Sequence, residues 1–386
     1  MARHHFLYPS TYGLLISLVV ALVIFGLLVT YSASFPVGEM FHGNPHYYIV
    51  RQSIYAGLGL LAMAGVVMVG YRRLRRLSFV ITLACVASLA AVLVPGVGEM
   101  RNGATRWLSI GPLEFQPGEI AKVGLVLYMS AWLAGRRNEI KEVGSGLLPF
   151  ALVVGLVAGL IVAEPDMGTA IVVGAVAVAM FFAAQAPWTH LMAVLMAGGL
   201  ASFLLVLAQD YRLSRIHTFL WPDRDPLGEG YQLAQLLTAF RLGGLTGQGW
   251  GAGQQKLGLL PNAHTDGVFA VVGEELGLVG AVALLALILI LAALGLKIAL
   301  ESPDSMGRFL AVGVSSWLAI QTIANVGGVT GLLPLTGVPL PFFSYGGSAL
   351  VSILLGIGLL LSVAREASKA PTLVGGAIEV RWGGKV

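Results

Sequence analysis

Charged residues are scarce in this chain. Only 11% of its 386 residues are Asp, Glu, Lys or Arg, whereas 57% are hydrophobic, and the mean hydropathy is +0.84. A soluble domain carries about 25% charged residues. The composition therefore excludes an ordinary soluble domain and requires most of the surface to face lipid.

Cysteine is almost absent too. The single cysteine, Cys85, lies within an apolar run, which excludes a disulfide framework and a thiolate metal site. The glycine-rich run from Gly243 to Gly253 lacks the Lys-Ser/Thr pair of a phosphate-binding P-loop. The net charge of +4 suits a membrane protein with basic cytoplasmic loops and gives no nucleic-acid signature.

Long hydrophobic runs, in contrast, recur along the whole chain. The first follows a basic start and has about 20 residues, enough to span a bilayer and too many for a signal peptide, so we expect an uncleaved helix. The runs predict an all-α integral membrane protein, one polytopic domain over residues 1–386. Its expected spans, about ten, are 12–33, 48–69, 77–95, 119–134, 147–163, 168–185, 189–208, 267–296, 307–327 and 347–364.

The distribution of Lys and Arg predicts the orientation. An even number of spans puts both termini on one side, which holds about 14 of these residues against about 9 on the other, so that side is expected to be cytoplasmic. The loop at 209–265, between spans seven and eight, is then extracytoplasmic. Leu233, Leu236, Leu237 and Phe240 within it predict a short amphipathic helix at the membrane surface. The tail at 366–386 is expected to be flexible.

Unusual polar residues gather on the predicted outer side. Ionisable groups within membrane segments usually face a cavity and have a function. The stretch PLPFFSYGG points to the same place, because Pro339 and Pro341 forbid a regular helix and irregular backbone at membrane depth must lie against protein or a cavity. The gathered residues are Arg101, Arg106, Trp107, Gln116, Glu119, Lys122, Glu164, Asp166, His264 and Asp266.

Each of these residues also has a purely structural interpretation. Asp266 could cap the eighth helix. Trp107 could belong to the interfacial aromatic belt. Glu119 and Lys122 are three apart, so they could form a simple helical ion pair. His264 could be an ordinary loop histidine.

Glu274 and Glu275 lie deeper, roughly 12 Å along the eighth helix. At least one of them must be buried. It could be protonated, or paired with a base such as Lys122 or Arg106, and the sequence leaves these alternatives open. We expect both residues to shape the cavity rather than to perform chemistry.

Five motifs give the sequence a family resemblance. RWLSIGPLEFQPGEIAK, EPDMGTA, GYQLAQ, LPNAHTDGVFAVVGEELGLVG and TGVPLPFFSYGGS stand in this order, and residues 10–365 resemble the SEDS family (shape, elongation, division and sporulation). Departures are small: Asn262 stands where the family commonly has Glu, Gly267 where it has a larger apolar residue, and Gly118 where it often has Ser. None touches the acidic centre, although Gly267 could loosen the turn that aims Asp266.

The resemblance implies a glycosyltransferase of the RodA and FtsW type. Such an enzyme polymerises lipid II, the undecaprenyl-diphosphate-linked disaccharide pentapeptide, into peptidoglycan strands outside the cytoplasmic membrane. Asp266 matches the family's essential acid and is expected to act as general base. One inverting displacement is expected, without an enzyme nucleophile. The expected substrate contacts are Trp107, Glu119, Lys122, Gln116, His264 and Ser344, with Arg101, Arg106, Lys122 and Arg241 as candidates to hold the diphosphate.

The resemblance also implies partners and alternatives. The family works beside class B penicillin-binding proteins, which are transpeptidases, and the QQKLGLLPNAHTD stretch with GEELG favours the division type over the elongation type. A divalent cation such as Mg²⁺ or Mn²⁺ could help to hold the diphosphate, although no metal-ligand spacing is legible. The alternative functions are a flippase for lipid II or another polyprenyl-linked glycan, which would need polar groups reaching both faces, and a scaffold for the transpeptidase.

Overall fold

Long apolar helices build the molecule. The computed structural model describes residues 11–101, 104–111, 113–136, 138–224, 228, 230–368, 372–374 and 377–379. The helices are α1 (Thr11–His42), α2 (Tyr47–Val69), α3 (Tyr71–Val92), α4 (Pro117–Gly135), α5 (Leu148–Ala163), α6 (Met167–Ala183), α7 (Trp188–Leu207), α8 (Asp210–Leu220), α9 (Tyr231–Gly243), α10 (Val268–Glu301), α11 (Ser305–Val329) and α12 (Gly347–Ala367). The basic start of the chain lies outside the described residues.

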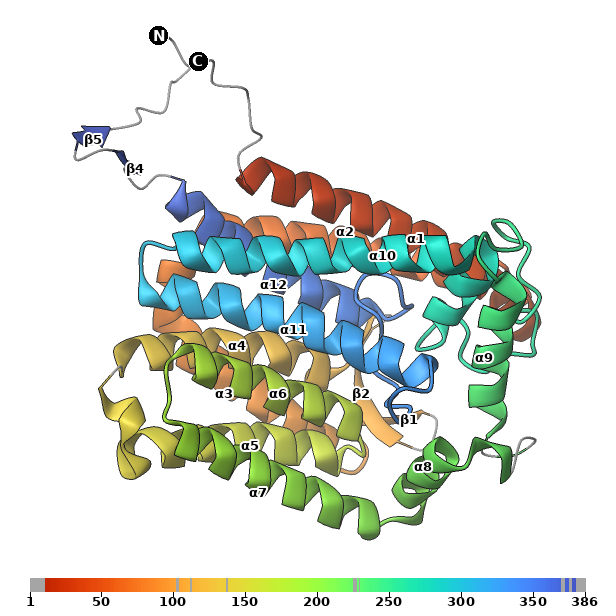
Figure 1. The fold of residues 1–386 in the computed structure, drawn as a ribbon, viewed down its shortest axis with the longest axis horizontal. Coiled ribbons are helices and arrows are strands. Elements are labelled where there is room, and N and C mark those ends of the chain that lie inside the picture. Colours follow the sequence, from red (N-terminus) through yellow and green to blue (C-terminus); the bar gives the residue numbers. More distant parts are fainter. Residues whose placement is uncertain are drawn as a thin grey trace.

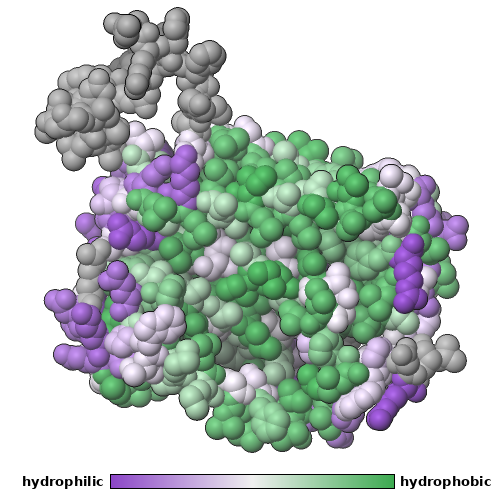
Figure 2. Space-filling model, in the orientation of Figure 1, coloured by the Kyte–Doolittle hydropathy of each residue, from purple (hydrophilic) through white to green (hydrophobic). Residues whose placement is uncertain are grey.

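The all-α multi-pass prediction is confirmed. Among the described residues, eight helices are long and apolar enough to cross a membrane, and the shorter apolar α6 packs with the charged α4 against α11 inside the bundle. Each of the ten expected spans thus lies in a helix. The helices run side by side, and the first residues of α1 and the last of α12 lie at the same end (Figure 1). A hydrophobic band separates two more polar ends (Figure 2).

The centre of the bundle is α12, whose residues are almost all buried against α2, α4 and α11. Small residues allow this close packing. A side chain on Gly356 would touch the ring of Trp317, and one on Gly59 of α2 would overlap Leu354. Such contacts between membrane helices depend on small residues because lipid offers no hydrophobic driving force for association.

The end of the bundle opposite the α1 start carries the irregular elements (Figure 1). Three short strands, β1 (Glu99–Arg101), β2 (Ala104–Ile110) and β3 (Leu113–Phe115), form an antiparallel sheet between α3 and α4, with Leu108 opposite Phe115. The expected amphipathic helix is α9, but it packs on α10, where the ring of Phe240 lies 5.7 Å from that of Phe269, and its Leu233 and Leu236 are buried. The sequence analysis missed the sheet and α8.

The remaining elements are small. Two 3₁₀ turns cover Glu139–Lys141 and Pro222–Arg224, and a π-helical turn, Val143–Leu147, leads into α5. Two strands near the end of the chain, β4 (Thr372–Val374) and β5 (Ala377–Glu379), pair antiparallel.

Candidate active site

A ladder of polar side chains on α11 organises the site. Trp317, Gln321 and Asn325 are four residues apart and therefore share one helix face. The Trp317 Nε1 donates to Gln321 Oε1 at 2.6 Å, and Gln321 Nε2 donates to the Pro339 carbonyl at 2.8 Å. Asn325 Nδ2 donates at 2.9 Å to the carbonyls of both Val338 and Asp266. One helix face thus joins the irregular 338–346 loop to the turn that carries Asp266.

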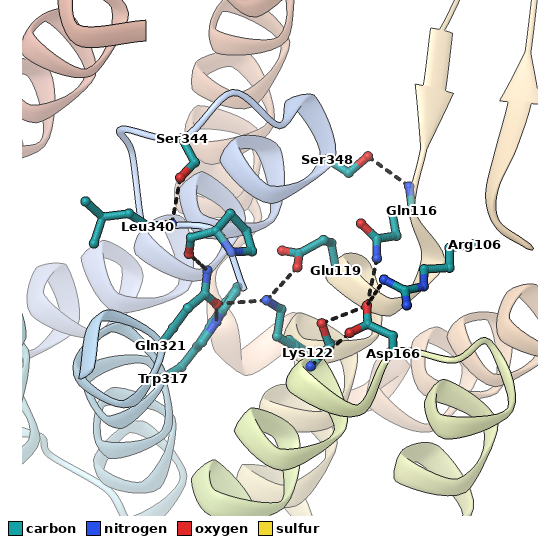
Figure 3. Close-up of polar contacts among 12 residues, drawn as sticks. Arg106, Gln116, Glu119, Lys122, Asp166, Trp317, Gln321, Leu340, Ser344 and Ser348 are labelled. Carbon is teal, nitrogen blue, oxygen red and sulfur yellow. Dashed lines mark hydrogen bonds and ion pairs between the residues drawn. The ribbon is translucent and has the colours of Figure 1, made fainter. Parts of the chain in front are cut away.

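The beginning of α4 meets this ladder. Lys122 Nζ lies 2.8 Å from Glu119 Oε1 and 2.8 Å from Gln321 Oε1, and 5.2 Å from the centre of the Trp317 ring (Figure 3). The expected ion pair between Glu119 and Lys122 is confirmed, and both residues are buried. Glu119 Oε2 is also buried, and no described residue donates to it. The pair therefore keeps a free acceptor at the centre of the site.

The 338–346 loop is the irregular segment that the prolines predict. Phe342 has a φ of 70°, and its carbonyl lies where a side chain on Gly26 of α1 would stand. Thr30 Oγ1 donates to the Phe343 carbonyl at 3.0 Å, and Gln52 of α2 bonds both the Ser344 carbonyl and the Gly346 amide. The loop is thus buried against protein, as irregular backbone at membrane depth must be.

Ser344 is part of this internal bonding. Its hydroxyl accepts from the Leu340 amide at 2.8 Å (Figure 3), and the residue is buried. Its expected contact with substrate stays a prediction.

Asp266 lies in the turn before α10 and is half-buried. Thr265 Oγ1 donates to its Oδ1 at 3.1 Å. Burial raises the pKa of the Asp266 carboxyl, and Thr265, the positive charge of Arg215 on α8 and a hydrogen bond from Gln232 on α9 partly oppose this rise. The structure does not have the alternative capping role, because the N-cap of α10 is Gly267 and no described side chain caps that end.

His264 helps to fix the same turn. Its carbonyl accepts from the Tyr345 amide at 2.8 Å, and its ring lies 4.7 Å from that of Tyr48. Burial lowers the pKa of its imidazole to about 4, and no described group bonds its buried Nδ1. His264 is therefore neutral near pH 7 and joins the 338–346 loop to the Asp266 turn.

A second polar group forms around Asp166 in the turn between α5 and α6 (Figure 3). Asp166 caps α6 by accepting from the Thr169 amide at 3.1 Å, and Gln116 Nε2 donates to its Oδ2 at 3.0 Å. Arg106 of β2 donates to the carbonyls of Glu164 and Pro165, and its Nη1 lies 3.8 Å from Asp166 Oδ2. Gln116 and Arg106 are thus brought together by this turn.

Glu164, at the end of α5, has no such partner. The residue is fully buried, and no described donor bonds either carboxyl oxygen. Burial, and then the charge of Asp166, raise the pKa of this carboxyl to about 8, although Arg106 acts in the opposite direction. Glu164 is therefore protonated near pH 7.

Glu274 and Glu275 anchor the glycine-rich loop. Glu275 pairs with Lys256, not with Lys122 or Arg106 as suggested by the sequence, and both glutamates are buried. Glu274 Oε1 accepts from the amides of Gln254 at 2.7 Å and Gln255 at 3.2 Å. The base comes from the loop, 19 residues away in the sequence, because the loop folds back over α10.

That fold-back breaks α10. Gly277 has non-helical backbone, with a φ of 68°, and the freed Leu278 amide donates to the Gly244 carbonyl at 2.9 Å. In return, Glu274 O accepts from the Gln248 amide at 3.0 Å. A side chain on Gly247 or Gly277 would overlap the facing backbone, so both positions require glycine.

Three expected site residues remain to be placed. Trp107 lies on β2 opposite Glu99, and Arg241 is exposed on α9. Arg101 ends β1, but the prediction for its side chain falls outside what the structure describes. No three His, Cys, Asp or Glu residues in the described part of the chain group together as metal ligands would.

Sequence reasoning missed Trp317, Gln321 and Asn325. Their signal was available, since three hydrogen-bonding side chains at a spacing of four stand in an otherwise apolar helix. It also missed Arg215 and Lys256, whose contacts are not local in the sequence.

Comparison with known proteins gives a consistent result. Residues 12–369 match the family model described as cell cycle protein, which covers FtsW, RodA and SpoVE. The probable peptidoglycan glycosyltransferase FtsW of Geobacter metallireducens is 39% identical over 93% of this chain and 96% of its own length. The stage V sporulation protein E of Bacillus subtilis is 38% identical over 91% of this chain and 95% of its own.

Two solved structures share the fold. One, described as the structural coordination of polymerization and crosslinking by a peptidoglycan synthase complex, matches with a TM-score of 0.76 and 35% identity over 92% of this chain and 98% of that one. The rod shape determining protein RodA of Thermus thermophilus matches with a TM-score of 0.68 and 33% identity over 92% of this chain and 97% of that one.

Proposed function

This chain belongs to the SEDS family of FtsW, RodA and SpoVE, and we propose that it polymerises lipid II into glycan strands at the outer face of the cytoplasmic membrane. It is a peptidoglycan glycosyltransferase, the activity in the names of its FtsW relatives. The observation that carries the proposed mechanism is the position of Asp266. A half-buried carboxylate with a raised pKa stands where α8, α9, α11 and the 338–346 loop converge.

Asp266 acts as the general base in this proposal. The acceptor sugar hydroxyl attacks the anomeric carbon of the donor, the bond from that carbon to the diphosphate oxygen breaks, and the hydroxyl proton passes to the Asp266 carboxylate. A base works best when its pKa approaches the working pH, which is the direction in which burial moves Asp266. The single displacement inverts the anomeric centre and needs no enzyme nucleophile.

The cations divide into two groups in this mechanism. Lys122 is held by Glu119 and Gln321, and Arg106 is held by two backbone carbonyls, so both are fixed in position before substrate arrives. Arg215 is exposed and makes one hydrogen bond, from Nη1 to the Leu335 carbonyl at 3.3 Å, and its charge reaches Asp266. We therefore assign the leaving diphosphate to Arg215 in addition to the four cations that the sequence suggested, since a guanidinium binds phosphate in bidentate fashion.

The proposal includes a partner and an orientation. A solved relative belongs to a synthase complex that couples polymerisation to crosslinking, which supports a class B penicillin-binding protein as the partner. The FtsW names among the relatives favour the division type. The connections between helices are rich in Arg and Lys at the end of the bundle where α12 ends, and this favours cytoplasmic termini. The site then lies at the opposite, extracytoplasmic end.

The flippase alternative finds no support in the α11 ladder. A route across the membrane needs polar groups beyond Trp317, but the positions four and eight residues earlier on this face are Gly313 and Phe309. Both are buried in the apolar core.

The test compares Asp266→Asn with a matched control, Asp210→Asn, an exposed acid at the start of α8 on the same side. Purified proteins polymerise labelled lipid II with the cognate transpeptidase present. Asp266→Asn is expected to keep its melting temperature and to lose about 10²–10⁴-fold in rate, while the control keeps the wild-type rate. A folded Asp266→Asn variant with the wild-type rate would overturn the assignment. Translocation of lipid II across vesicles by a wild type that forms no polymer would support the flippase.

A further inference from the structure

The end of the bundle away from the site carries a hollow lined with arginine. Its volume is about 470 Å³, and it lies between the first two turns of α3 and the turn from α10 to α11. The lining residues are Tyr71, Arg72, Arg75, Arg76, Asp304 and Met306. A smaller hollow of about 240 Å³ adjoins it and adds Arg73, Arg365 and Glu366. We call the two together the arginine hollow.

The acids of the arginine hollow are already engaged. Asp304 caps α11 by accepting from the Gly307 amide at 2.8 Å, and its Oδ2 accepts from the Tyr71 hydroxyl at 2.7 Å. Arg72 lies 3.4 Å from Asp304 and 3.6 Å from Glu366. Because one arginine contacts both acids, the remaining arginines of the hollow carry positive charge in excess.

The dipole of α3 adds to the unfavourable energy of this excess positive charge. Arg72, Arg73, Arg75 and Arg76 stand in the first two turns of α3, where the helix dipole is positive and attracts anions. The first turn of α3 contains no acid, and the side chain that bonds its N-terminus is neutral: the Ser362 hydroxyl accepts from the Tyr71 amide at 2.8 Å. Arg75 and Arg76 both line the hollow and are exposed to solvent. An anion bound there would relieve both the mutual repulsion and the dipole.

The surroundings indicate which anion. Leu77, Phe79 and Val80, on the next turn of α3, are more than half exposed at 51%, 62% and 59%, as lipid-facing side chains are. The hollow thus lies where a bilayer headgroup region would meet hydrocarbon. Basic pockets at the cytoplasmic ends of membrane helices bind lipid phosphates, and that leaflet is rich in anionic lipid.

We propose that the arginine hollow binds the phosphate headgroup of an anionic phospholipid from the cytoplasmic leaflet. Arg75 and Arg76 donate to the phosphate oxygens, as planar guanidinium groups do well. The acyl chains lie along the apolar face that begins at Leu77. The site is separate from the catalytic end and does not depend on the glycosyltransferase assignment, although the choice of leaflet rests on the orientation proposed above.

The test uses the full-length protein in bilayer discs of phosphatidylcholine, with or without phosphatidylglycerol. Native mass spectrometry counts the retained phosphatidylglycerol, and a titration gives its affinity. The variant is Arg75→Gln/Arg76→Gln. The control, Arg136→Gln/Lys141→Gln, removes the same charge from the connection between α4 and α5, outside the arginine hollow. Loss of two arginine contacts is expected to weaken retention about 25-fold, roughly fivefold for each.

The outcomes separate the sources of phosphate. Wild type and control are expected to retain one tightly held phosphatidylglycerol that the variant loses, and inorganic phosphate at matched ionic strength is expected to displace little of it. Equal retention by variant and control would overturn the site. If inorganic phosphate raised the melting temperature of the wild type and phosphatidylglycerol did not, the lipid assignment would be overturned. The melting temperature of each protein in pure phosphatidylcholine checks that the variants are folded.

Discussion

Two buried lysine–glutamate pairs in the described part of the chain differ in one respect. In the pair of Lys256 and Glu275, protein groups donate to both carboxylate oxygens. The carboxylate accepts from Lys256, from the Ser32 hydroxyl at 2.8 Å and from the Gly251 amide at 3.1 Å. Lys122 and Glu119 are equally buried, but only one glutamate oxygen has a partner among the described residues. We call these the closed pair and the open pair.

The difference separates structure from function better than burial does. A buried charge whose bonds are all made can only hold the fold together, and the closed pair fastens the glycine-rich loop to α10. A buried acceptor without a donor costs about 1–3 kcal/mol, so the open pair is stable only because its neighbours compensate. A substrate hydroxyl or amide that reached Glu119 would remove that cost. The open pair is therefore the better candidate for substrate binding.

The largest effect is expected for Lys256→Met, which removes one partner of the closed pair. Removing the lysine leaves Glu275 as an uncompensated buried charge, and we expect a loss of about 3–5 kcal/mol in stability. Thermal unfolding in detergent measures it. The double variant Lys256→Met/Glu275→Gln is expected to recover part of the loss. Wild-type stability in the single variant would show that the pair is not closed.

Glu164 extends the comparison to a buried carboxyl with no lysine. Its pKa is raised to about 8 in the fold, so the folded state holds a proton that the unfolded state releases near its ordinary pKa of 4.5. Stability therefore falls as the pH rises from about 4.5 to 8, by on the order of a few kcal/mol. Glu164→Gln is expected to remove this slope and to be the more stable protein at pH 9.

Unfolding measured between pH 5 and pH 9 tests that expectation. The exposed Glu39→Gln serves as the control and should keep the wild-type slope. A Glu164→Gln variant with an unchanged slope would mean that the carboxyl is ionised in the fold.

Glu119→Gln tests the open pair itself. The amide still offers an oxygen to Lys122, but the buried ammonium loses its counter-charge, so part of the stability is expected to be lost as well and the rates are compared where both proteins are folded. Loss of a charged acceptor for substrate should lower kcat/KM for lipid II about 10–100-fold, the effect of one hydrogen bond to a charged group. Glu275→Gln is the matched change at the closed pair and should lower stability instead. If Glu119→Gln lost only stability, the open pair would be structural.

The smallest effect is expected at an exposed pair. Arg136 and Glu139 lie 3.0 Å apart with side chains 41% and 49% exposed. Such pairs contribute about 0–1 kcal/mol. Arg136→Gln should therefore shift unfolding by less than any variant above and leave polymerisation unchanged. A larger shift would mean that exposure is a poor guide to the energy of ion pairs in this protein.

Local patterns in the sequence predicted much of the fold. Every expected span became a helix because a long apolar run has few alternatives in a bilayer. The Glu119–Lys122 pair followed from a spacing of three on one helix. Lys256 could not be assigned to Glu275 in the same way, because their contact depends on how a glycine-rich loop folds back. Likewise, nothing in the apolar pattern distinguishes Gly277, where α10 breaks, from the glycines that lie inside regular helices.

The sequence predicted which residues belong to the candidate site better than it predicted the contacts among them. Arg106, Gln116 and Asp166 were expected on one side of the membrane, but their direct contact depends on the α5–α6 turn, which the sequence did not predict. Asp266 was open to a capping role until the structure put Gly267 at that position. Both differences come from turns, whose geometry depends on contacts between distant segments rather than on helical period.

The break in α10 has a mechanical consequence. Four backbone hydrogen bonds, from 2.9 to 3.2 Å, join the two sides of Gly277 to the glycine-rich loop, through Gln248, Gly249, Leu278 and Val279. The glycine-rich loop therefore bridges the break and replaces the helical hydrogen bonds that α10 loses at Gly277. The Asp266 turn, which leads into the outer piece of α10, is thus held in position by the glycine-rich loop and α9 as well as by α10 itself.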